Sequence, residues 1–395
     1  MKACRHEPAV AALAPSVAAI RNAVRAALSG YAVPARGERA ERAPQSRSEE
    51  SRVLVACSGG PDSLALAAAT AFVAPRLGLR PGLITVDHQL QPGSADRAQA
   101  VAGWAEQAGF DPVEVCTVDV TTSPDAAWTE ERRERSDQSD EGRRHPQGAR
   151  ARVGGGRRRH LGPEAAARQA RYAALVDAAQ RHGAAAVLLG HTRDDQAETV
   201  LLALARGAGP RGLAGMPVRR EVDGVTLLRP LLDIARDQAA DACAVLDVKP
   251  WADPHNADPA YARSRVRTAA LPALTAALGP DVVDNLARTA RLLAVDTEYL
   301  DALASAALDG ARVPGCGGLD VGRLAALPAA LRGRVLHAFA RECGAPGAAL
   351  AYQHIEALEA LVNAWHGQGP VHLPGGIEVG RGPGPGGQAA LDKVK

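Results

Sequence analysis

The residues in this sequence that are best suited to chemistry form a glycine-rich run, SGGPDS, at positions 58–63. An apolar, strand-like run at 53–57 precedes it, and a helical run rich in alanine and leucine follows. Glycines let backbone N–H groups turn toward an anion, and the hydroxyls and the helix N-terminus add donors and partial positive charge. The pattern predicts a nucleotide-phosphate loop, with an ordinary capped turn as the alternative. The expected binding residues are Ser58, Gly59, Gly60, Pro61, Asp62 and Ser63.

A second set of chemically active residues follows another strand-like run, at 185–190. On a helix, His191, Asp194, Asp195 and Glu198 would fall on one face, at i, i+3, i+4 and i+7. Clustered carboxylates repel one another unless a cation sits among them, and Mg²⁺ carrying ATP phosphates suits oxygen ligands. Helix capping explains one or two acids near the N-terminus but not the whole set.

Length and composition indicate a globular protein with more than one domain. The chain has 395 residues, a net charge of +2, 46% hydrophobic residues and only 3% aromatic residues. The six cysteines are scattered without metal-ligand spacing, which is typical of buried thiols in a reducing compartment. No apolar run approaches the ~18 residues of a membrane span, and no signal peptide is evident, so we expect a cytoplasmic protein that does not bind membranes.

Short apolar strands alternate with helices from residue 52 onward, and this predicts an α/β domain with a parallel sheet. The expected strands are 53–57, 82–87, 113–118 and 185–190. Ligands of such sheets bind beyond the carboxyl ends of the strands, where both sets of residues fall. We expect four parts: a helix and polar linker at 1–51, the α/β domain at 52–275, a smaller helical domain at 280–379 and a flexible tail at 380–395.

An arginine-rich segment at about 121–160 interrupts the α/β domain. Residues 129–160 contain ten arginines and six acidic residues. A solvated insertion without a specific role is the favoured interpretation, and a basic arm that attracts RNA phosphates is the alternative.

The motifs and their order resemble those of the tRNA(Ile)-lysidine synthetase family, which belongs to the PP-loop ATP-pyrophosphatase superfamily. The phosphate loop resembles the SGGxDS loop of that superfamily, which has a Rossmann-like fold. Further matching segments are EAAARQARY, HTRDDQAET, LLALARGAGPRGLAGM, LLRPLL and WADPHNADPAYARSRVR, within about residues 53–275. The family usually has asparagine at the position of Ser264 and lacks the long insertion, so the chain departs from the family at these two points.

The resemblance implies an ATP-dependent ligase that attaches L-lysine to the wobble cytidine of tRNA(Ile) with a CAU anticodon. The cytidine O2 would attack the α-phosphorus of ATP, pyrophosphate would leave, and lysine would displace AMP at C2. Departure of pyrophosphate requires neutralised charge, which the loop and a Mg²⁺ held by Asp62 and Asp195 could supply. Attack by lysine requires a neutral amine, and a carboxylate such as Asp195 could take the proton. The expected catalytic residues are Asp62, Asp195 and His191.

The resemblance also assigns peripheral roles. Asp87 and His88 end the second strand, where the family holds adenosine, although helix capping and an exposed loop position explain them equally well. The helical domain at 280–379 would recognise the tRNA, and a homodimer is compatible with the sequence. The residues expected to contact substrate or tRNA are Arg168, Arg171, Arg206, Arg211, Asn256, Arg263, Arg265 and Arg267.

Two rival functions can be compared with these residues. A tRNA thiolase of the same superfamily passes sulfur to a cytidine or uridine, but its cytidine-type members hold C-x-x-C pairs, which this chain lacks. A non-catalytic RNA-binding protein on a degenerate nucleotide fold would have lost the loop or its acids. Asp62 and Asp195 are both present.

Overall fold

The computed structural model describes residues 14–32, 51–87, 89, 93–118, 163–251, 258–385 and 387–394. Most of the expected linker, the insertion at 121–160, His88 and Asn256 therefore lie outside the described residues. The chain divides into two compact units, Met1–Ala290 and Arg291–Lys395. The division falls inside one continuous helix, α11 (Val282–Ala311), beyond the change of pattern near residue 280 that the sequence displays.

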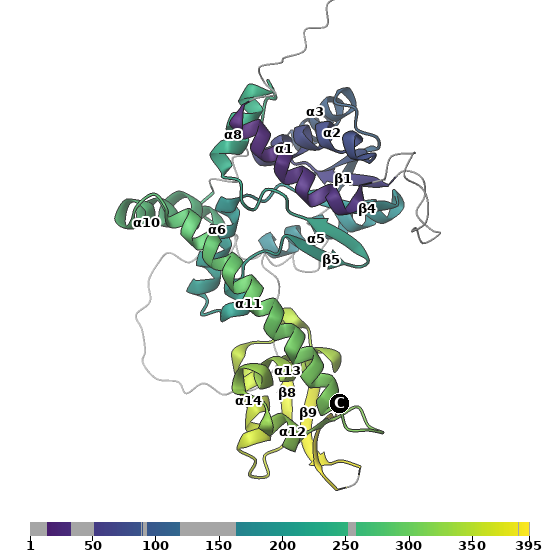
Figure 1. The fold of residues 1–395 in the computed structure, drawn as a ribbon, viewed down its shortest axis with the longest axis vertical. Helices are drawn as coiled ribbons and strands as arrows, with labels where there is room; N and C mark the ends of the chain where they lie inside the picture. Colours follow the sequence, from purple (N-terminus) through teal and green to yellow (C-terminus); the bar gives the residue numbers. More distant parts are fainter. Residues whose placement is uncertain are drawn as a thin grey trace, which may run out of the picture. The chain divides into compact units, whose positions relative to one another are not determined.

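The first unit is built on a six-stranded sheet with the order β3-β2-β1-β4-β6-β5 (Figure 1). The first five strands of this order run parallel, and β5 pairs antiparallel with β6. The prediction of a parallel α/β domain and of its first four strands is confirmed. The strands are β1 (Arg52–Ala56), β2 (Arg80–Asp87), β3 (Val113–Thr117), β4 (Ala184–Leu189), β5 (Arg219–Val222) and β6 (Val225–Leu228).

Helices cover both faces of this sheet because its central strands are apolar on both sides. Val53 and Val55 of β1 belong to one core with α1, α2 and α8, whereas Leu54 belongs to a second core with α5. Strand order reverses direction at β1, between β2 and β4, and such a switch point opens a crevice at the carboxyl ends of the strands. The surrounding helices are α1 (Pro15–Leu28), α2 (Pro61–Val73), α3 (Ser94–Gln107), α5 (Pro163–Arg181), α6 (Arg193–Ala205), α7 (Pro210–Leu213) and α8 (Arg236–Val245).

The hairpin of β5 and β6 was not predicted. Its turn is Asp223-Gly224, with φ of 48° and 78°, and Asp-Gly is a strong signal for a tight hairpin turn. The hairpin carries the first sheet beyond β4. After α8, the unit continues with α9 (Ala262–Arg265), a π-helical turn (Val266–Ala270) and α10 (Leu271–Leu278).

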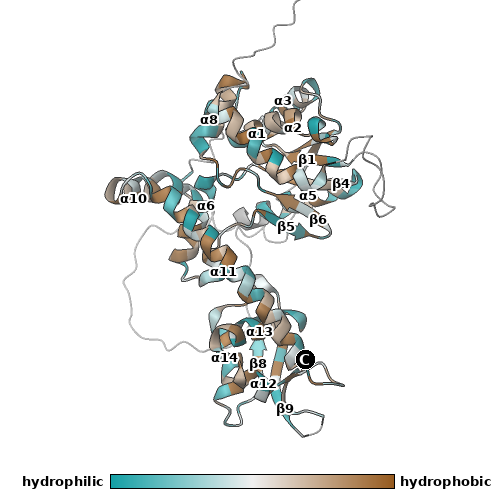
Figure 2. Ribbon diagram, in the orientation of Figure 1, coloured by the Kyte–Doolittle hydropathy of each residue, from teal (hydrophilic) through white to brown (hydrophobic). Residues whose placement is uncertain are grey.

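The second unit combines the expected helices with a small antiparallel sheet. Figure 2 shows α11 changing between hydrophilic and hydrophobic bands along its length, and Ala304 and Leu308 from its second half enter the core of this unit. The other helices are α12 (Val321–Ala326), α13 (Ala329–Glu342) and α14 (Tyr352–Asn363). The antiparallel sheet has the order β7-β10-β9-β8, with β7 (Leu319–Asp320), β8 (Val371–Leu373), β9 (Ile377–Pro383) and β10 (Ala389–Lys393).

The expected flexible tail at 380–395 is corrected by this sheet. Residues 379–383 of β9 pair with 389–393 of β10, and Leu391 is fully buried. Gly380, Gly382 and Pro383, which suggested flexibility, lie within β9 itself. No helix in the described parts of the chain is long and apolar enough to cross a membrane.

Candidate active site

The loop between β1 and α2 has the geometry of a phosphate-binding turn. Gly59 has φ of 82°, a conformation that favours glycine, and Gly60 is the N-cap of α2. The Ser63 hydroxyl donates to Gly60 O at 3.0 Å and accepts from the backbone N–H of Ser58 at 3.2 Å. The loop is therefore closed on itself, and the free N–H groups at the start of α2 are available to an anion.

Two neighbouring segments hold this loop from outside. The backbone N–H of Trp251 donates to Gly59 O at 2.9 Å, and the guanidinium of Arg97 lies 3.5 Å from the centre of the Trp251 ring. A Cβ at Gly59 would lie 2.9 Å from Cγ2 of Val101 in α3. Fixing the Gly59 carbonyl in this bond keeps one negative end of the backbone away from a phosphate.

The end of β4 approaches the start of α2 so closely that only glycine fits. A Cβ at Gly190 would lie 3.0 Å from Ser63 Cα and 3.2 Å from the Asp62 carbonyl carbon. These are backbone atoms, so a larger residue must displace the helix that carries the loop.

Replacing Gly190 by alanine is expected to raise KM for ATP about tenfold and to lower stability by about 1–3 kcal/mol, the usual cost of overpacking. Steady-state kinetics and thermal unfolding test this result. Gly103→Ala is the matched control, because nothing lies within 4 Å of a Cβ at that position in α3. A normal KM in Gly190→Ala would contradict the role of the close approach.

Asp62, in the first turn of α2, carries a buried carboxylate oxygen that lacks a partner among the described residues. That atom is Oδ1, while Oδ2 lies 3.7 Å from Nε of Arg236. Burial and the nearby Asp195 carboxylate raise the pKa of Asp62 to about 7, against the lowering effect of Arg236 and Arg267. An unpartnered carboxylate beside a phosphate loop is suited to bind a cation or a hydrogen-bond donor of the substrate.

Two acids of α6 form a buried network with three arginines from other elements. Glu198 is fully buried and accepts from Arg236 at 3.1 Å, from Arg263 at 2.8 Å and from Arg267 at 2.7 Å. Asp195 Oδ1 accepts from Nη2 of Arg236 at 3.0 Å and from Nη2 of Arg267 at 3.1 Å. The carboxylates thus hold like-charged guanidinium groups side by side, and these arginines supply the cationic charge that the sequence pattern required.

The contacts of Asp195 leave little capacity for a metal ion. Its Oδ2 accepts from the backbone N–H of Thr192 at 2.9 Å and from the Thr192 hydroxyl at 3.1 Å, which forms a capping box. Burial would raise the pKa of Asp195, but Arg236 and Arg263 outweigh it and hold that pKa below its usual range. The metal role of Asp195 stays a prediction, which its present contacts do not favour.

His191 reaches this site from the end of β4 and not from the helix face that we expected. It precedes α6, whose N-cap is Thr192. Burial lowers the pKa of His191 to about 3, so the ring is neutral at physiological pH, and its Nδ1 is buried without a partner among the described residues. A neutral ring with an unused nitrogen can bind a substrate group.

The remaining predicted residues are divided between the site and its surroundings. Burial lowers the pKa of the Arg171 guanidinium, and Asp195 and Arg263 are among the charges near it. Arg265 points away from the network and donates to Pro259 O and Ala260 O at 2.7 and 2.9 Å. The others have local roles or exposed positions. Arg168 donates to the Tyr172 hydroxyl at 3.4 Å, and Asp87 accepts from the Gln89 N–H at 2.9 Å. Arg206 at the end of α6 and Arg211 in α7 are exposed.

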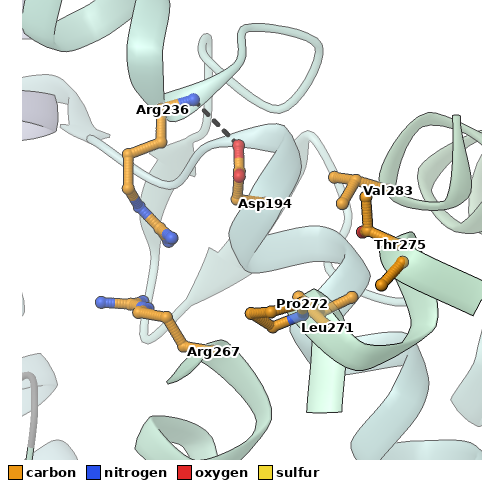
Figure 3. Close-up of a pocket in the computed structure, with 8 residues that line it drawn as sticks. Asp194, Arg236, Arg267, Leu271, Pro272, Thr275 and Val283 are labelled. Carbon is orange, nitrogen blue, oxygen red and sulfur yellow. Dashed lines mark hydrogen bonds between the residues drawn. The ribbon is translucent and has the colours of Figure 1, made fainter. Parts of the chain in front are cut away.

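A pocket of about 470 Å³ opens beside the arginine network. Figure 3 shows the guanidinium groups of Arg236 and Arg267 facing each other at its polar end, with Asp194 bonded to the backbone N–H of Arg236 at 2.8 Å. The opposite wall is largely apolar and comes from α10 and the start of α11. It consists of Leu271, Pro272, Thr275, Ala276 and Val283.

Arg236 and Arg229 are site residues that the sequence did not identify. Arg236 begins α8 and touches both acids of the network as well as Asp62. Arg229 is 2% exposed, donates to Pro217 O at 2.8 Å and is one of the charges near His191. Both follow the hairpin that was missed. For Arg229 the available signal was a charged residue within the apolar run LLRPLL.

The glycine loop closes on itself after the first strand of a parallel sheet, and Asp62 and partly buried arginines lie beside it. These features are typical of an α/β domain that binds ATP. A family model described as a PP-loop domain matches residues 37–274, and a second, described as a TilS substrate binding domain, matches 319–382. The chain belongs to the tRNA(Ile)-lysidine synthase family.

Curated relatives support this membership over almost the whole chain. A tRNA(Ile)-lysidine synthase of Salinispora tropica is 59% identical and covers 94% of this chain and 95% of its own length. Those of Salinispora arenicola and Thermobifida fusca are 57% and 49% identical and cover 94% and 91% of this chain and 96% and 94% of their own. A solved U34-tRNA thiolase of Methanococcus maripaludis is similar at 18% identity with a TM-score of 0.48, covering 70% of this chain and 80% of its own.

Proposed function

We propose that this protein uses ATP to ligate L-lysine to C2 of the wobble cytidine in tRNA(Ile) with a CAU anticodon, releasing AMP and pyrophosphate. The observation that carries the proposal is the closed phosphate loop, with Asp62 on its helix and the Arg236–Arg267 pair beside it. Relatives named tRNA(Ile)-lysidine synthase over almost the full length support the choice of substrate. A thiolase is not favoured, and the intact loop argues against a degenerate binding protein.

The phosphate loop and the arginine network divide the work of the first step. Backbone N–H groups at the start of α2 bind the polyphosphate and orient the α-phosphorus for attack by the cytidine O2. Negative charge then grows on the departing pyrophosphate. Arg236 lies beside Asp62 and, with Arg267, supplies positive charge held in place before the reaction, which costs no reorganisation.

A Mg²⁺ ion fits this site through Asp62 and not through Asp195. Asp62 has a buried oxygen without a partner, whereas both oxygens of Asp195 are already bonded. Within the described ranges no group of three His, Cys, Asp or Glu side chains gathers as a metal site, so phosphate oxygens and water would complete the coordination. When bound, the ion would neutralise phosphate charge.

Asp195 is proposed to orient the arginines, in place of the proton-accepting role that the sequence suggested. A carboxylate whose pKa lies below its usual range is a weak base toward the lysine ammonium group. Its hydrogen bonds to Arg236 and Arg267 hold the two guanidinium groups on the side where they face Asp195 and Glu198. The opposite side faces the pocket.

The pocket beside the arginines is proposed to receive the lysine substrate. Free lysine has a carboxylate, two ammonium groups and an apolar stem. The pocket offers two guanidinium groups, the Asp194 carboxylate and an apolar wall. The guanidinium groups suit the carboxylate of lysine, Asp194 suits an ammonium group, and the apolar wall suits the stem.

Filling the pocket tests this assignment. Ala276→Trp should raise KM for lysine at least about tenfold while leaving lysine-independent ATP–pyrophosphate exchange unchanged, because the bulk lies on the apolar wall. Ala277→Trp is the matched control, an exposed neighbour on α10 that does not line the pocket. An unchanged KM for lysine in Ala276→Trp would place the lysine elsewhere.

The reaction itself is tested by following both ends of ATP. With α-labelled and γ-labelled ATP, the proposal requires label in AMP and in pyrophosphate, and net turnover only when tRNA and lysine are both present. Turnover that needs a sulfur donor and no lysine would support the thiolase. No cleavage with any tRNA would support the binding protein.

We also propose that the protein works in the cytoplasm. The five cysteines in the described part of the chain are unpaired, and burial raises the pKa of the Cys57 and Cys243 thiols. Such thiols are poorly reactive, as expected for structural residues in a reducing compartment.

A further inference from the structure

The second unit exposes a tryptophan on a rigid turn at the end of α14. Trp365 is 40% exposed. The Gln368 side chain ties the turn together by donating to Ala360 O at 3.3 Å and accepting from the His366 N–H at 2.8 Å. Gly367, with φ of 90°, permits this path. The turn therefore holds part of the Trp365 ring in water, where the ring loses the favourable free energy of burial.

A cation without an acidic partner lies against this ring. Arg381 of β9 donates to Leu361 O at 2.9 Å and to Val362 O at 3.3 Å, and its guanidinium carbon lies 5.5 Å from the centre of the Trp365 ring. Among the described residues, no Asp or Glu forms an ion pair with Arg381. The guanidinium therefore keeps its charge for an external anion, and the exposed part of the Trp365 ring remains available to a base.

The charge of this unit makes such a local feature important for RNA. Residues 291–395 contain nine lysines and arginines and ten acidic residues. Long-range attraction to phosphates is therefore weak, and binding must rely on particular contacts. Stacking of an unpaired base on an aromatic ring is worth about 1–3 kcal/mol and needs no net charge.

We infer that Trp365 is a stacking platform for an unpaired nucleotide of the tRNA, with Arg381 binding an adjacent phosphate. The inference rests on the proposed function, because it identifies where the tRNA meets the second unit. The turn lies within the residues that match the substrate-binding family model. Tyr352, 78% exposed at the opposite end of α14, has no cation over its ring within the described part.

The test measures the Kd of the CAU-anticodon tRNA(Ile) transcript by filter binding, without ATP or lysine. Trp365→Ala should weaken binding about 5- to 100-fold, Trp365→Phe should retain most of the affinity, and Tyr352→Ala should match the wild type. KM for ATP and the thermal midpoint should not change in any of the three. Arg381→Gln should lower the slope of log Kd against log salt by about 1, whereas Trp365→Ala should leave that slope unchanged.

Each outcome decides the inference. Wild-type affinity in Trp365→Ala, an equal loss in Tyr352→Ala, or failure of Trp365→Phe to retain affinity would overturn it. If the wild type binds and modifies the tRNA while Trp365→Ala behaves normally, the inference fails and the proposed function stands. If the wild type itself does not bind this tRNA, both fail.

Discussion

Asp62→Asn is expected to reduce ATP cleavage by at least about 10²–10³-fold while leaving the protein folded. The substitution keeps the shape of the side chain but removes the charge that faces the phosphate loop. Lysine-independent ATP–pyrophosphate exchange measures the effect on the first step. Asp96→Asn is the matched control, because Asp96 is also an acid in the first turn of a helix, in α3, but is exposed.

The same variant should be more stable than the wild type at neutral and alkaline pH. The pKa of Asp62 is raised from 3.8 to about 7 in the folded protein, so the folded state binds this proton more tightly than the unfolded state. Wild-type stability should therefore fall relative to Asp62→Asn as pH rises from about 4 through 7, by about 4 kcal/mol at most. Denaturant unfolding in EDTA at pH 5 and pH 8 measures this difference. Equal pH dependence in both proteins would contradict the burial of this charge.

Glu198→Gln should lower the stability of the protein, unlike Asp62→Asn, and should impair the reaction as well. Glu198 is fully buried and binds three partly buried arginines, so losing its charge removes one of the two carboxylates that compensate these guanidinium groups. Breaking a buried ion pair typically costs about 3–5 kcal/mol. We expect the thermal midpoint to fall by roughly 10 °C in differential scanning calorimetry. Pyrophosphate binding should also weaken, because the separated guanidinium groups no longer present a pair.

Glu221→Gln is the control for the Glu198 experiment. Glu221 also pairs with an arginine, Arg219, at 2.8 Å, but its side chain is 52% exposed. Exposed ion pairs contribute about 1 kcal/mol or less, so this variant should unfold near the wild-type temperature. A Glu198→Gln protein that is as stable as Glu221→Gln and binds pyrophosphate normally would contradict the network described above.

The phosphate loop and the parallel sheet were predictable because their causes are local. Glycine spacing, an apolar run before it and a helix after it specify the turn between β1 and α2 without reference to distant residues. The same reasoning missed β10, because glycines and prolines near residue 385 suggested flexibility. Those residues lie near the turn between β9 and β10, yet Leu391 beyond the turn is buried in the sheet.

The cationic partners of Asp195 and Glu198 could not be predicted from the sequence of α6 alone. The pattern of Asp195 and Glu198 correctly required a cation, but the cations are Arg236, Arg263 and Arg267, which are 38 to 72 residues distant in the sequence. The family resemblance assigned Arg263 and Arg267 a substrate-binding role, but it did not reveal the ion pairs that fix them. Only the packing of α9 and the π-helical turn against α6 reveals those pairs.

Incorporation of radiolabelled lysine most directly tests the central claim, that this PP-loop site makes lysidine. The purified protein is incubated with ATP, Mg²⁺, lysine and either the tRNA(Ile) transcript with a CAU anticodon or the initiator methionine tRNA with the same anticodon. Label is expected in the first tRNA and not in the second, and it should be lost in Asp62→Asn. Cleavage of ATP to AMP and pyrophosphate with another tRNA, without lysine in the product, would contradict the central claim.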